Sequence, residues 1–124
     1  YIILAIKLNN PKLHGEVFNF GPKNNQNKNV LELVKEIKRN WNNAKWKINK
    51  NSKLKNKESK LLKLNSNKAK KYLNWTPILN FKESVNLTSN WYVDYYKKGR
   101  RITGNISKNN IIEYNNILVK KVKI

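Results

Sequence analysis

Two amphipathic segments, each preceded by an asparagine, constrain the fold of this chain more than any other feature. Asn29 is followed three residues later by Glu32, and Asn80 is followed three residues later by Glu83. At that spacing each side chain can accept a hydrogen bond from the backbone amide of the other residue, and this reciprocal pair starts a helix. The sequence therefore predicts two helices, one beginning after each asparagine.

Apolar side chains recur at helical spacing behind each cap and define the faces that we expect to be buried. The predicted stripes are Val30, Leu33, Val34, Ile37 and Trp41 in the first helix, and Val85, Thr88, Trp91, Tyr92 and Tyr95 in the second, which Gly99 ends. Four of these residues are aromatic. Because they lie on the stripes, we interpret them as core residues and not as platforms on which nucleic-acid bases stack.

Shorter elements complete the expected fold, which is of the α/β class. Residues 1–8 are typical of the end of a helix that Asn9-Asn10-Pro11 stops, and because this helix begins without a cap we expect upstream sequence to be missing. Short strands are predicted at Glu16–Phe20, Trp46–Ile48 and Leu61–Leu64. Further helices are predicted after Ser66, carrying Ala69, Tyr72 and Leu73, and from Ser107 to Tyr114, followed by an edge strand or frayed tail at 118–124.

The chain has 124 residues and a formal net charge of +20, which would ordinarily suggest an anionic partner such as nucleic acid. However, 24 of the 27 basic residues are lysine, and the chain also has 24 asparagines and 12 isoleucines. Such a composition is typical of an AT-rich genome, whereas proteins that read bases favour arginine. We therefore expect no nucleic-acid partner, with a small basic nucleic-acid-binding module as the alternative.

Several kinds of catalytic site are excluded by what the sequence lacks. The chain has no cysteine and a single histidine, so thiolate chemistry and a histidine metal cluster are both excluded. The four glycines are isolated, and no tyrosine is followed four residues later by lysine, so neither a phosphate-binding glycine loop nor a redox dyad is present. No apolar run is long enough to span a membrane, and we expect a cytoplasmic protein without a membrane partner.

A series of short motifs follows in a fixed order over residues 1–114. The segments are Tyr1–Leu8, the Asn19-Phe-Gly-Pro22 turn that ends 11–22, Val30-Leu-Glu-Leu-Val34 with Trp41 and Trp46, Glu58 through Lys68-Ala69, Leu73-Asn-Trp-Thr-Pro77, Thr88 with Trp91-Tyr92, and Ile111 with Tyr114. In this order and spacing they resemble CDP-glucose 4,6-dehydratases, a family of extended short-chain dehydrogenases/reductases. The sequence departs from the family pattern at Asn65, which replaces an aspartate, at Lys57, which replaces a histidine, and at Asn74, which replaces a glycine.

The resemblance implies that residues 1–117 are the C-terminal, substrate-binding portion of such an enzyme and that residues 118–124 are a tail. The family removes a hydride from C4 of the hexose of CDP-glucose, eliminates water across C5 and C6, and returns the hydride at C6. NAD, the Tyr-x-x-x-Lys pair and the acid/base residues would belong to an N-terminal part outside this chain. The fragment alone is therefore expected to be inactive, and the full-length enzyme is expected to be a homo-oligomer. A dehydratase or epimerase for dTDP-, UDP- or GDP-sugars is the alternative within this class.

Two residues are candidates for contact with the nucleotide-sugar substrate. Glu58 stands seven residues before Asn65, and related epimerases place an acidic residue at that offset, where it reaches the ribose hydroxyls. A carboxylate suits that contact because it can accept hydrogen bonds from both vicinal hydroxyls. Lys55, three residues before Glu58, is a candidate for contact with a phosphate. No catalytic, cofactor-binding or metal-binding residue is predicted in the chain.

Overall fold

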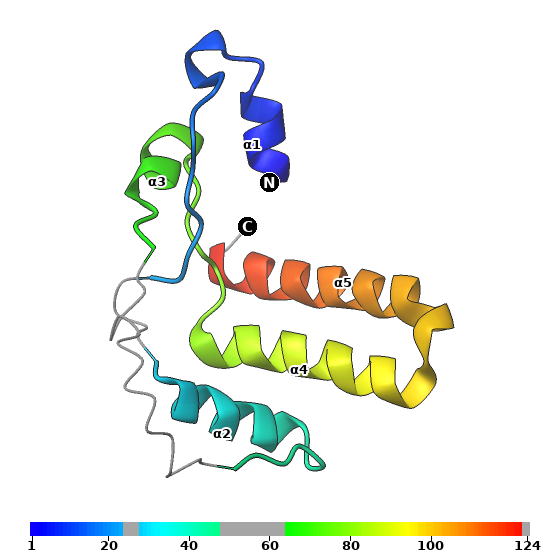
Figure 1. Ribbon diagram of the computed structural model, residues 1–124. Coiled ribbons are helices and arrows are strands. Elements are labelled where there is room, and N and C mark those ends of the chain that lie inside the picture. The colour runs from blue at the N-terminus through cyan, green and yellow to red at the C-terminus, as the bar shows by residue number, and fades with distance from the viewer. Residues whose placement is uncertain (24–27, 48–63, 123–124) are drawn as a thin grey trace. The chain divides into compact units, whose positions relative to one another are not determined.

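The computed structural model describes residues 1–23, 28–47 and 64–122, most of which are helical (Figure 1). The chain forms two compact units, one of Tyr1–Asn24 with Lys57–Pro77 and the other of Asn25–Asn56 with Ile78–Ile124. The first unit contains α1 (Ile2–Lys7), a 3-10 helix (Pro11–Leu13) and α3 (Asn67–Leu73). The second unit contains α2 (Val30–Asn40), α4 (Phe81–Lys98), a 3-10 helix (Arg100–Ile102) and α5 (Thr103–Val122).

The first unit is held together by a small apolar core to which α1 and α3 both contribute. Three side chains in this core are buried: Leu13, Ala69 and Leu73. Four partly buried side chains pack against them: Leu4, Phe18, Phe20 and Trp75. An ion pair between Glu16 and Lys68 links the extended segment before Gly21 to α3. Residues far apart in the sequence thus converge on one core.

The predicted strand at Glu16–Phe20 is wrong, because this segment is extended but pairs with no other described segment. An isolated extended segment is not a sheet, since a strand needs a partner for its backbone amides and carbonyls. Trp46, Lys47 and Leu64 are not in strands either, and the rest of the two other predicted strands lies outside the described residues. Over the part that the structure describes, the fold is therefore mostly helical and not plainly α/β.

Both ends of α3 depend on asparagine. Ser66 occupies the predicted cap position, but its hydroxyl makes no capping bond, and the Oδ1 of Asn65 instead accepts a hydrogen bond from the backbone amide of Asn67 at 2.9 Å. At the other end, Asn74 takes the left-handed conformation with φ of 53°. Glycine adopts this conformation most readily, and asparagine is among the few other residues that tolerate it.

The second unit is a helical layer in which α2 and α5 each pack against α4. Both predicted capping boxes are confirmed. The Oδ1 of Asn29 accepts a hydrogen bond from the amide of Glu32 at 2.9 Å, and the Oδ1 of Asn80 accepts one from Glu83 at 2.9 Å. The returning bonds from the asparagine amides to the glutamate carboxylates are 3.0 and 2.7 Å long. The two predicted long helices therefore begin at the expected residues.

Several expectations for the second unit are corrected. Val30 and Leu33 of α2, which we expected on the buried face, are 75% and 39% exposed. Thr88 is exposed and does not belong to the buried stripe of α4, where Val85, Leu87 and Ser89 are buried instead. The predicted short helix from Ser107 and the predicted strand or tail at 118–124 are replaced by one helix, α5, that continues to Val122. The reason is packing: Ile106, Tyr114 and Ile117 recur at helical spacing and lose exposure, which keeps the helix against α4.

None of the described helices is both long enough and apolar enough to cross a membrane.

Candidate functional site

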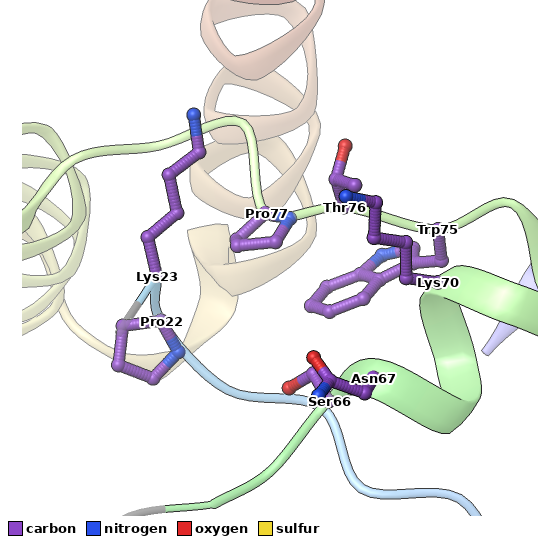
Figure 2. A pocket seen from close by; sticks show the side chains of 8 residues that line it. All are labelled: Pro22, Lys23, Ser66, Asn67, Lys70, Trp75, Thr76 and Pro77. Atoms are coloured by element: carbon purple, nitrogen blue, oxygen red, sulfur yellow. The ribbon is translucent and has the colours of Figure 1, made fainter. Parts of the chain in front are cut away.

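A pocket of about 220 Å³ in the first unit is the candidate functional site (Figure 2). Three segments line it: the Pro22 turn, the beginning of α3, and the chain that follows α3. The lining residues are Pro22, Lys23, Ser66, Asn67, Lys70, Trp75, Thr76 and Pro77. Figure 2 shows Lys23 beside the two prolines and Lys70 beside Trp75 and Thr76, so that the pocket has a cation on either side.

Local backbone features bring these segments together. A Cβ placed on Gly21 would lie 3.0 Å from the Cβ of Leu64, so the absence of a side chain allows the two segments to pass this closely. The left-handed Asn74 ends α3 and turns the chain back, which brings Trp75 against the core. The ring of Phe20 meets the indole of Trp75 nearly at right angles, with the centroids 5.0 Å apart.

The charges of the pocket favour an anionic ligand. Lys23 and Lys70 both line it, neither forms an ion pair with another described residue, and no carboxylate is among the lining residues. The nearby Lys68 is already paired with Glu16 and lies over the ring of Phe18, with its nitrogen 5.1 Å from the ring centroid. Two cations that form no ion pair with a described residue lie beside one concave surface, and together they raise the local concentration of anions.

The other lining groups are suited to binding and not to proton transfer. The indole and the two prolines form apolar walls, and the amide of Asn67 and the hydroxyl of Thr76 add polar groups on exposed residues. The hydroxyl of Ser66 is covered by protein and has no hydrogen-bond partner among the described residues. Because histidine and carboxylate are absent from the lining, the pocket lacks a general acid or base of the usual kinds. The arrangement can hold a small anion with an attached apolar group.

The residues predicted to contact substrate, Glu58 and Lys55, lie outside the described residues. The sequence prediction did not select any of the eight residues that line the pocket. A signal was present, because Pro22 ends one motif, Lys70 follows the Lys68-Ala69 motif, and Trp75-Thr76-Pro77 forms another. We interpreted these motifs as turns and helix ends. That interpretation describes their local structure, but it does not predict that they line one pocket together.

The aromatic side chains of α4 form a continuous series of ring contacts and not the core that was expected. Trp91 stacks on Tyr95 with the ring centroids 5.4 Å apart and the planes 8° from parallel, and further contacts join Tyr92, Tyr96 and Trp41 to the series. The prediction that Tyr92 is a core residue is wrong, since it is 46% exposed. Trp91 and Tyr95 are partly buried, and the indole of Trp91 donates a hydrogen bond to Ser107 Oγ at 3.0 Å.

The described residues contain no cluster of three or more side chains that could hold a metal ion. Comparison of the chain with protein-family models, with curated protein sequences and with solved structures gave no match in any of the three.

Proposed function

We propose that this chain is the substrate-side portion of a nucleotide-sugar 4,6-dehydratase similar to the CDP-glucose 4,6-dehydratases. The complete enzyme would convert CDP-glucose to CDP-4-keto-6-deoxyglucose and would have the α/β architecture of that family. NAD would be bound outside this chain, because the four glycines are isolated and form no loop that could hold a pyrophosphate. The role of this chain is to bind the nucleotide sugar.

The observation that carries this proposal is the convergence of three motif segments on one pocket. Pro22 of the Asn-Phe-Gly-Pro turn, Lys70 beside the Lys-Ala motif and Trp75 of the Trp-Thr-Pro turn come from separate parts of the sequence and line the same cavity. The left-handed backbone of Asn74 supports the same conclusion, because the resemblance places glycine there. The motifs on which the resemblance rests therefore have a joint structural role.

The chemistry of the pocket is consistent with an enzyme in which one part binds the substrate and another part carries out the reaction. Its cations, Lys23 and Lys70, suit the diphosphate of a nucleotide sugar, and its apolar walls suit a ring. The pocket lacks groups for moving protons or hydride. Binding by this chain and chemistry by another part would together give the dehydratase reaction.

The experiment that tests this proposal is a titration of the 15N-labelled chain with CDP-glucose, followed by NMR at the indole Nε1–H of Trp75. A Trp75→Phe variant assigns this resonance. We expect a saturable shift, and we expect affinity to fall roughly tenfold or more in the double variant Lys23→Gln with Lys70→Gln, since a hydrogen bond to a charged group contributes about 1.5–3 kcal/mol.

The matched control is the double variant Lys82→Gln with Lys97→Gln, which removes the same charge from exposed positions of α4. The control should bind CDP-glucose like the unmodified chain. An equal loss of affinity in both double variants would show that binding depends on overall charge alone. Titrations with UDP-glucose and dTDP-glucose compare the alternative nucleotides.

We further predict that the isolated chain forms no 4-keto-6-deoxy sugar from CDP-glucose and does not bind NAD. The physical reason is that it has neither a phosphate-binding glycine loop nor a Tyr-x-x-x-Lys pair. Chromatography of the reaction mixture and calorimetric titration with NAD measure the two properties. Formation of the product by the purified 124-residue chain would contradict the prediction.

A small nucleic-acid-binding module is a second candidate, favoured by the exposed rings Tyr92 and Tyr96 in a chain with a net charge of +20. Stacking of bases on such rings would add to electrostatic binding, and the affinity would fall steeply with salt. A mobility-shift assay with single-stranded DNA near physiological salt tests this function. Absence of binding excludes it, and loss of binding on Tyr92→Ala with Tyr96→Ala would support it.

A further inference from the structure

We draw no further inference here: the strongest candidate, the patch of exposed rings that Tyr92 and Tyr96 form on the surface of α4, carries none, because nothing in the structure shows what covers it.

Discussion

At the scale of single residues, Asn74 shows how an asparagine ends a helix in a conformation that glycine usually adopts. Its φ of 53° lies in the left-handed region, where side chains other than asparagine are costly. We predict that Asn74→Gly raises the free energy of unfolding by up to about 1 kcal/mol and that Asn74→Ala lowers it by about 1–2 kcal/mol. Urea unfolding followed by circular dichroism measures both changes.

The control for this prediction is Asn109, an exposed residue within α5. There the order should reverse, with alanine more stable than glycine, because a helix interior favours alanine. The same order at both positions would contradict a backbone explanation for Asn74.

Gly21 is a residue whose missing side chain allows two segments of the chain to approach each other closely. A methyl group added there would lie 3.0 Å from the Cβ of Leu64, which is closer than most carbon contacts in proteins. We predict that Gly21→Ala lowers the free energy of unfolding by about 1–3 kcal/mol, the usual cost of overpacking. Gly104→Ala is the control, because nothing lies within 4 Å of the added carbon and its position is helical. Thermal melts of the two variants should shift in different directions.

At the scale of elements, Glu83 couples the capping box of α4 to α5. The hydrogen bond from Lys121, and next to it the one from the amide of Asn80, hold the pKa of Glu83 below its ordinary value of 4.5. A carboxyl whose folded pKa is lowered adds stability above its unfolded pKa, and this stability is lost as the pH falls through the folded pKa. The second unit should therefore lose stability in acid below pH 4.5.

We predict that Glu83→Gln lowers the free energy of unfolding at neutral pH by up to about 1 kcal/mol, as expected for a partly exposed ion pair. In this variant the free energy of unfolding should also fall less steeply as the pH drops into the acid range. Denaturant unfolding at a series of pH values measures both effects. Glu113→Gln is the control, since Glu113 is exposed and forms no ion pair with a described residue. If both variants had the same acid profile as the unmodified chain, the contact with Lys121 would have no role in stability.

At the scale of the whole molecule, the prediction concerns Glu58 and rests on the proposed function. In a fusion that places the NAD-binding portion of a CDP-glucose 4,6-dehydratase before this chain, Glu58→Gln should weaken binding of CDP-glucose by about 1.5–3 kcal/mol, the contribution of a hydrogen bond to a charged group. KM should rise and kcat should change little, because a contact that is made equally in the ground and transition states contributes to binding and not to turnover. Steady-state kinetics separate the two constants, and an unchanged KM would show that Glu58 does not touch the nucleotide.

The sequence alone predicted those features of the molecule that depend on near neighbours along the chain. The capping boxes at Asn29 and Asn80 join residues three apart, and in both places a segment with apolar residues at helical spacing continues the helix. The end of α3 before Trp75 was likewise predictable from local signals. These features need no information about distant segments.

Tertiary structure alone decided the features that depend on distant partners. Residues 16–20 have the composition of a strand, but a strand exists where another segment accepts its hydrogen bonds, and none among the described residues does. The last residues of α5 alternate weakly between apolar residues and lysine, yet they continue the helix, and Lys121 bonds to the carbonyl of Ile78 and to Glu83. The pocket joins Lys23 to Lys70 and Trp75, which lie far apart in the sequence. Local sequence thus determined where helices begin, whereas strand pairing and the pocket were decided by packing, because their energies come from contacts between segments distant along the chain.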